Sequence, residues 1–316
     1  MVMAVRLANY PHSTFSFQLP SHSRRRGLSR KRLGRLSASM NSGDDLSSKL
    51  MEFPYVSGPH RRLMVDLLST VDSRLGSSLQ SCTLPSDVQH FGNDSGTARA
   101  TLNLRSGIPS SQIDLIVGSW IHCELPSGGA LNITSLSAYL RASTDAPHFL
   151  LDLIQSSSTS LVLVLDLTPR KDLIMYPEYL KTYYEDPQLD RHRQRLHDLP
   201  QVSPYISPSL YIRAILSPTA IIASIDVGAS EGTTEIGDII RDHIDPISKE
   251  FLNFWIESCA CTDRNLGEVE QTYLAERDRV IKNKTIEVDL GSSFPRLFGK
   301  DVAERTLGVL KEYYNK

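Results

Sequence analysis

Four aspartates lie within apolar segments of the sequence, where a carboxyl group can take part in proton transfer. They are Asp114, Asp152, Asp166 and Asp289. Burial disfavours the ionised carboxylate and raises its pKa toward neutrality, so such a group can protonate a bound substrate at physiological pH. The competing interpretation for each is a carboxylate held by a backbone or arginine partner. We expect that second outcome for Asp114 and Asp166, with Arg170 as the partner of Asp166.

The sequence contains no fingerprint of a resident cofactor or metal. It has no Gly-x-Gly-x-x-Gly after a strand, no phosphate-binding loop and no His-Glu-x-x-His. The four cysteines form no Cys-x-x-Cys pair, and we expect free thiols rather than a zinc or iron–sulfur site. We therefore predict no bound cofactor and no metal.

The amino-terminal 43 residues differ in composition from the rest of the chain. They hold eight Arg and Lys residues, many serines and no acidic residue, which is typical of an organelle transit peptide. A basic arm that binds nucleic acid is the alternative. Without these residues, 26 basic and 36 acidic residues remain, and a body with a formal charge of −10 argues against nucleic-acid binding. Composition alone leaves plastid and mitochondrion open.

The remaining residues, 44–316, predict one domain. Alternating or continuous apolar patterns predict five consecutive strands with short polar connections, which favour antiparallel neighbours. Helical spacing predicts a helix after Pro59 and further helices in the second half of the chain. No apolar run reaches the roughly 18 residues of a membrane span. The fold class is therefore α/β, an α/β/α sandwich in which helices flank a mostly antiparallel central sheet.

The predicted strands and helices have the following ranges. The strands are 97–104, 113–120, 131–140, 149–155, 161–167, 210–216, 220–227 and 285–290, and an extension of the second strand to Cys123 is left open. The later helices are 177–185, 187–197, 235–261, 263–280 and 302–313. Asp152 and Asp289 would both lie on strands, the latter on the same face as Glu287.

From Met51 onward the chain resembles red chlorophyll catabolite reductases, a family related to the ferredoxin-dependent bilin reductases. The segments that carry the resemblance span most of the body: Met51–Ser57, Gly118–Cys123, Leu131–Ser135, Leu153–Ser158, Tyr205–Leu210 and Phe294–Gly299. The resemblance implies an α/β/α sandwich and a plastid enzyme of the stroma. It also implies ferredoxin as external electron donor, with reduction of a methine-bridge double bond in red chlorophyll catabolite to give the primary fluorescent catabolite.

The resemblance assigns roles to individual residues. It implies that Asp152 and Asp289 are the catalytic proton donors and that Leu216 faces the substrate. A known family member carries Glu at the position of Asp152 and an aromatic residue at that of Leu216, so the reach of the donor and the product epimer stay open. Arg213 is a candidate partner for acidic substrate groups. His122 is a candidate for substrate binding, against the alternative of a hydrogen-bonded core histidine.

Two further expectations concern partners. A positive stretch, Arg191 to His197, is a candidate docking patch for ferredoxin, against the alternative of a solvated helix face. The family also implies pheophorbide a oxygenase as a partner and a homodimer. A carrier that binds the tetrapyrrole without reducing it, or a scaffold in a chlorophyll-breakdown complex, remains the alternative function.

Overall fold

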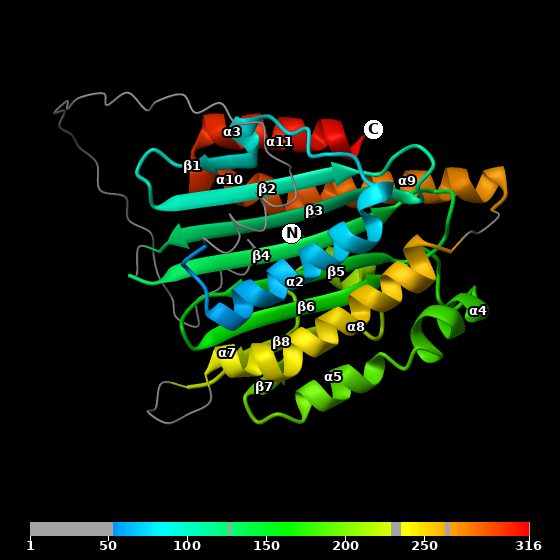
Figure 1. Cartoon of the computed structure of the whole chain (residues 1–316), viewed down its shortest axis with the longest axis horizontal. Helices are drawn as coiled ribbons and strands as arrows, with labels where there is room; N and C mark the ends of the chain where they lie inside the picture. Colours follow the sequence, from blue (N-terminus) through cyan, green and yellow to red (C-terminus); the bar gives the residue numbers. More distant parts are fainter. Residues whose placement is uncertain (1–52, 126–127, 229–234, 263–265, 316) are drawn as a thin grey trace.

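The computed structural model describes residues 53–125, 128–228, 235–262 and 266–315. The predicted transit peptide, residues 1–43, lies outside these ranges. Eight strands of the described ranges form one sheet in the order β1-β2-β3-β4-β5-β6-β8-β7, and every neighbouring pair is antiparallel (Figure 1). The strands are β1 (His90–Gly92), β2 (Ala98–Ser106), β3 (Ile113–Glu124), β4 (Ala130–Leu140), β5 (His148–Gln155), β6 (Ser160–Thr168), β7 (Val202–Pro204) and β8 (Ile221–Asp226).

Helices cover both faces of this sheet. One layer holds α2 (Gly58–Leu75), α7 (Ile236–Ile239) and α8 (Asp245–Trp255), and the opposite layer holds α9 (Glu268–Thr285), α10 (Gly291–Phe298) and α11 (Lys300–Tyr314) (Figure 1). The short helices are α3 (Ser86–Gln89), α4 (Pro177–Leu180), α5 (Asp190–His197) and α6 (Leu210–Ile215). This arrangement confirms the predicted α/β/α sandwich with an antiparallel sheet.

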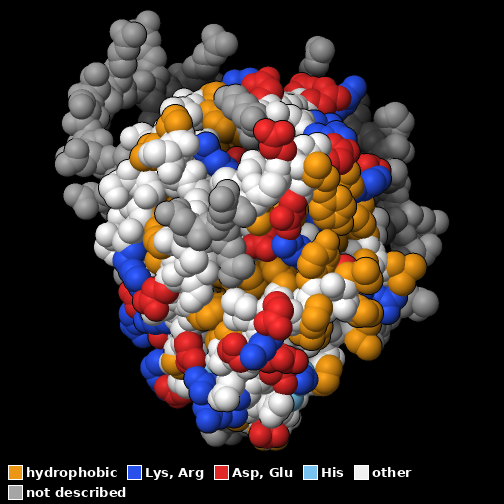
Figure 2. All heavy atoms as spheres, turned by 90° about the vertical axis from the view of Figure 1, so that its right-hand side faces the viewer, with side chains coloured by type: hydrophobic (Ala, Val, Ile, Leu, Met, Phe, Trp, Pro, Cys, Tyr) orange, Lys and Arg blue, Asp and Glu red, His pale blue; other side chains and the backbone are white. Residues whose placement is uncertain are grey.

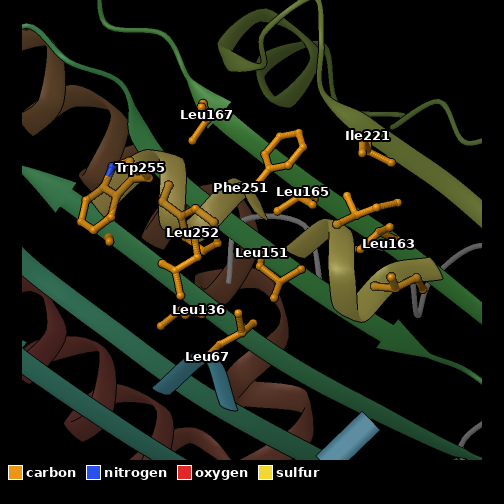
Figure 3. Close-up of a cluster of buried hydrophobic side chains, with 14 of the residues drawn as sticks. Leu67, Leu136, Leu151, Leu163, Leu165, Leu167, Ile221, Phe251, Leu252 and Trp255 are labelled. Carbon is orange, nitrogen blue, oxygen red and sulfur yellow. The ribbon is translucent and has the colours of Figure 1, made fainter. Parts of the chain in front are cut away.

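Each side of the sheet has its own hydrophobic core, because side chains alternate between the faces of a strand. On the side of α2 and α8, Leu151 of β5 packs with Phe251 and Trp255, and the Trp255 indole donates a hydrogen bond to the carbonyl of Pro147 (3.0 Å) (Figure 3). On the side of α9, α10 and α11, Leu150 of the same strand belongs to a second core. We call these sides the α8 face and the α9 face.

The sequences of the central strands are therefore almost continuously apolar. All eight residues of β5 are buried, since both of its faces are covered. The helices are amphipathic by contrast, as in α8, where Ile247, Phe251 and Trp255 recur every four residues on the buried side. The five predicted consecutive strands are confirmed, and so is the long helical segment after residue 235, which the structure resolves into α7, α8 and adjoining π-helical turns.

Two predicted strands are wrong. Residues 210–215 form α6, where the Ser209 side chain caps the helix by accepting from the backbone N–H of Ile212 (3.4 Å). Residues 285–290 continue α9 through a π-helical turn, Ile286–Leu290. Its apolar residues alternate as in a strand, but Ile286 and Leu290 are also four apart, and the helix buries both of them. The short strands β1 and β7 were not predicted.

Candidate functional site

Asp152 lies in the centre of the sheet on the α9 face. Its neighbours in the register are Ser135 on β4 and Val164 on β6. It alternates with Leu150 and Ile154, which pack in the core beneath α9, α10 and α11. The side chain is 0% exposed, so the structure encloses a carboxyl group between the sheet and the helical layer.

Two buried tyrosines lie within electrostatic range of Asp152. Tyr139 comes from β4 and Tyr314 from the end of α11, and their ring centroids are 6.0 Å apart. Burial is the largest cause that raises the pKa of both phenols, and the charge of Asp152 raises it further. Both phenols therefore stay protonated through the neutral pH range and can donate an O–H. Sequence patterns gave no signal for this pair, because its members are brought together only by the fold.

An ion cluster fixes α9 to the ends of β5 and β6. Asp278 of α9 accepts from Arg170 Nη2 (2.5 Å) and is 3.1 Å from His148 Nε2. Burial acts to raise the pKa of Asp278, but His148 and Arg170 together hold it well below its ordinary range. Burial lowers the pKa of His148 to about 4, so at neutral pH its ring is uncharged and donates an N–H to Asp278. Asp278 is thus a structural carboxylate.

A second ionic contact joins α9 to the sheet. Lys282 pairs with Asp114 of β3, and the Lys282 ammonium lies 5.6 Å from the centroid of the Tyr139 ring. Asp114 is a held carboxylate, as expected, but its partner is a lysine and not the expected backbone or arginine group. Together with Asp278, this contact holds α9 over the α9 face at two positions one helical turn apart.

Asp166 is also held, but not by the predicted partner. It is 0% exposed, accepts from Ser217 Oγ (2.5 Å) and accepts from the Ser217 backbone N–H (3.0 Å). Arg170 instead points to Asp278, so the expected pair of Asp166 with Arg170 is wrong. Burial is the main cause that raises the pKa of Asp166 to about 6, and the hydrogen bonds from Ser217 oppose the rise. This bond anchors the segment that follows α6, including Leu216.

The remaining predicted residues are distributed over the molecule. Leu216 is half-buried and packs against the core of the α9 face, so it shares that face with Asp152. Asp289 lies in the helical turn Ile286–Leu290 of the layer above the same face, and its side chain is outside the described part of the structure. Arg213 is exposed on α6.

His122 lies on the opposite side of the sheet from Asp152. Its strand neighbour Trp120 belongs to the α8-face core. The imidazole Nδ1 is 2.8 Å from Asn132 Oδ1, and the Tyr55 ring stacks on it at 3.6 Å between centroids. The structure therefore brings Asp152 and Leu216 to one face and does not bring His122 to them.

The predicted basic patch on α5 is largely neutralised. Arg191 and His192 both pair with Glu250, at 2.6 and 2.9 Å, and Arg193 pairs with Asp190 at 2.6 Å. His192 is also buried. Three of the five basic residues thus already have acidic partners, which weakens this stretch as a docking surface for an acidic protein.

Metal-ligand clusters and membrane-spanning helices are both absent from the described residues. Within them no group of three or more His, Cys, Asp or Glu side chains is placed to hold a metal ion. No helix among them has the length and apolar character needed to cross a bilayer.

Comparisons of the sequence with known proteins point to one family. The family model for red chlorophyll catabolite reductase (RCC reductase) matches residues 59–312. The chloroplastic red chlorophyll catabolite reductase of Arabidopsis thaliana is 50% identical over 280 residues, which are 87% of each chain. The chloroplastic red chlorophyll catabolite reductase 1 of Oryza sativa subsp. japonica is 40% identical over 314 residues, covering 96% of this chain and 94% of that protein.

A solved structure supports the fold. Tomato phytochromobilin synthase, crystallised in complex with biliverdin, superposes with a TM-score of 0.63 and 16% sequence identity. The match covers 81% of this chain and 84% of the synthase. At this identity the likeness concerns the fold alone.

Proposed function

The chain belongs to the red chlorophyll catabolite reductase family, and we propose that it reduces red chlorophyll catabolite to the primary fluorescent chlorophyll catabolite, with ferredoxin as electron donor. The observation that carries the proposal is the Asp152 carboxyl group, enclosed at the centre of the sheet under a helical layer. An acid in that environment is suited to protonating a substrate whose own conjugated system holds the added electrons.

The reaction adds two electrons and two protons across one methine-bridge double bond. Reduced ferredoxin delivers the electrons one at a time, and each ferredoxin is oxidised once. In the proposed mechanism Asp152 supplies one proton and Asp289 the other, and both are reprotonated from solvent between turnovers. The buried phenols of Tyr139 and Tyr314 are uncharged O–H groups near Asp152, and they keep this region free of competing negative charge.

The substrate would lie between the sheet and the layer of α9, α10 and α11. Leu216 contributes an apolar contact on that face, and the Asp166 carboxylate fixes its segment through Ser217. Arg213 is proposed as a contact for acidic substrate groups, which its exposure allows only at the outer edge of the site. For His122 we propose a structural role in joining β3 to β4, because it hydrogen-bonds Asn132 on the far face.

The cellular setting is proposed from the relatives and the leader. The names of two relatives place those proteins in the chloroplast. We propose the same organelle for this chain, with residues 1–43 as the transit peptide, residues 44–316 as a single mature domain, and the stroma as the compartment.

A partner surface is available near α4 and the start of α9. Large apolar side chains are exposed there, Ile174 and Met175 before α4 and Val269 and Tyr273 on α9. Apolar side chains gather on this side of the molecule (Figure 2). Apolar patches of this kind mark protein interaction sites, and they support the proposed homodimer or a complex with pheophorbide a oxygenase.

Anaerobic turnover of the chain from residue 44 tests the function. Red chlorophyll catabolite and reduced ferredoxin should together give a blue-fluorescent product that requires the protein. Asp152→Asn should lower kcat by about 10²–10⁴-fold, the usual contribution of a general acid, while the substrate Kd stays within a few-fold. Asp152→Glu, which keeps the acid, is the matched control and should retain turnover.

Two outcomes contradict parts of the proposal. Full turnover by Asp152→Asn would remove Asp152 from the mechanism. Tight binding by the wild type with no product, given active ferredoxin and intact substrate, would favour the carrier or scaffold function instead.

A further inference from the structure

Two buried serine hydroxyls on the α9 face lack a hydrogen bond to any described residue. Ser119 on β3 is 2% exposed and Ser135 on β4 is 1% exposed. Neither Oγ atom has a hydrogen-bond partner within the described part of the chain. A buried hydroxyl that lacks a partner loses its water without compensation, so alanine would be the more stable choice at either position.

These serines form a straight row with Asp152. The register pairs Ser119 with Ser135 and Ser135 with Asp152, so the three side chains point to the same face from adjacent strands. Adjacent strands lie about 4.8 Å apart, and the row therefore spans about 10 Å. The next positions on this face, Val117 and Ile133, are aliphatic core residues. The row is a polar strip across an apolar surface.

We propose that Ser119 and Ser135 hydrogen-bond the polar edge of an open-chain tetrapyrrole and hold it beside Asp152. This inference rests on the proposed function, which it deepens by naming substrate-positioning residues. A serine hydroxyl donates to a carbonyl oxygen and accepts from an N–H. A linear tetrapyrrole carries both groups, as terminal lactam carbonyls and ring N–H groups, along a mostly apolar skeleton. Ligand binding would therefore supply the hydrogen-bond partners that the described residues do not provide for these two hydroxyls.

The row distinguishes these serines from another buried hydroxyl. Ser248 of α8 is also fully buried, and its Oγ also lacks a partner among the described residues. It belongs to the helical layer that covers the α8 face, away from Asp152. Ser248 therefore provides a matched control, with the same change in chemistry and burial but on the wrong side of the sheet.

The experiment measures tetrapyrrole binding and thermal unfolding of Ser119→Ala, Ser135→Ala and Ser248→Ala in the absence of ferredoxin. Red chlorophyll catabolite is the main probe, and biliverdin is a second open-chain tetrapyrrole. We expect Kd to rise about 3- to 10-fold for each of Ser119→Ala and Ser135→Ala, as for one hydrogen bond, with Tm unchanged or higher. Ser248→Ala should leave Kd unchanged.

The unfolding measurement separates ligand positioning from a structural role. A Kd within twofold of wild type for both row variants would overturn the inference. A lowered Tm in both row variants would also overturn it, because the hydroxyls would then have partners within the protein. If the wild type turns over substrate but the Kd values of the variants are unchanged, only this inference is contradicted. If the wild type binds the tetrapyrrole but forms no product, only the proposed reductase function is contradicted. Failure of the wild type to bind either tetrapyrrole would overturn both.

Discussion

Replacing Asp166 by asparagine should stabilise the protein at neutral pH, although Asp166 is completely buried and doubly hydrogen-bonded. The carboxylate accepts from both the hydroxyl and the backbone N–H of Ser217. An asparagine can keep both contacts, because its carbonyl accepts the backbone N–H and its amide donates to Ser217 Oγ. That hydroxyl still has Thr219 Oγ1 at 3.1 Å as an acceptor. The substitution therefore removes the charge and keeps both contacts with Ser217.

The magnitude follows from the pKa of Asp166. Burial is the main cause that raises it from 3.8 to about 6, a rise of about two units, and each unit corresponds to about 1.4 kcal/mol. The folded state therefore binds a proton more tightly than the unfolded state does. Stability from this group is fully present below pH 4 and is lost as pH rises to 6. At pH 7.5 the loss is about 3 kcal/mol, so Asp166→Asn should gain about 1–3 kcal/mol there.

Urea unfolding from pH 4 to pH 7.5 measures this effect. The free energy of unfolding of Asp166→Asn minus that of wild type should increase with pH and level off above pH 6, and other titrating groups cancel in the difference. Ser217→Ala is the paired variant and should have the opposite sign at pH 7.5, because it removes a donor from the carboxylate. A difference that is flat with pH, or a destabilised Asp166→Asn at pH 7.5, would refute the reasoning.

Three further expectations concern the stability of the fold, and each is measured by urea unfolding. Asp278→Asn should lower the free energy of unfolding by about 3–5 kcal/mol, because it leaves the fully buried Arg170 without its carboxylate. A decrease below about 1 kcal/mol would contradict a structural ion pair. Phe251→Ala should lower the free energy of unfolding by about 3–5 kcal/mol, because it leaves a cavity in the α8-face core. An unchanged urea concentration at the unfolding midpoint would contradict the packing in Figure 3. Burial lowers the pKa of His60 from 6.5 to about 4. The neutral ring therefore contributes its full stability above pH 6.5, and this contribution is lost as the pH falls to 4. His60→Gln should show a smaller decrease in the free energy of unfolding between pH 6.5 and pH 4 than the wild type does.

The sequence was sufficient to predict the layers of the fold and most of its strands. The five strands from β2 to β6 are sequential and joined by short polar turns, so local patterns were enough to place them. The prediction failed for residues 285–290 because a six-residue run can satisfy the periods of both a strand and a helix. The preceding helix α9 resolves the ambiguity, since a chain already in a helix extends it at little cost.

Partnerships between polar residues could not be predicted from the sequence. Arg170 is four residues from Asp166, which suggested a local pair, yet it binds Asp278, which is 108 residues away in the sequence. The choice depends on where α9 lies over the sheet, and that position exists only after folding. The buried row of Ser119 and Ser135 was missed for the same reason, because each serine alone is unremarkable in a strand.

The change from strand to helix at residues 285–290 alters how the two proposed proton donors are positioned. Asp152 is fixed by hydrogen-bonded neighbours on both sides in the sheet. Asp289 instead belongs to a helical turn whose backbone continues α9, and α9 is held by Asp278 and Lys282. The distance between the two donors therefore depends on ionic contacts outside the proposed site. Weakening those contacts should impair proton delivery by Asp289 while leaving Asp152 in place, because packed sheet strands shift less readily than a helical layer that rests on them.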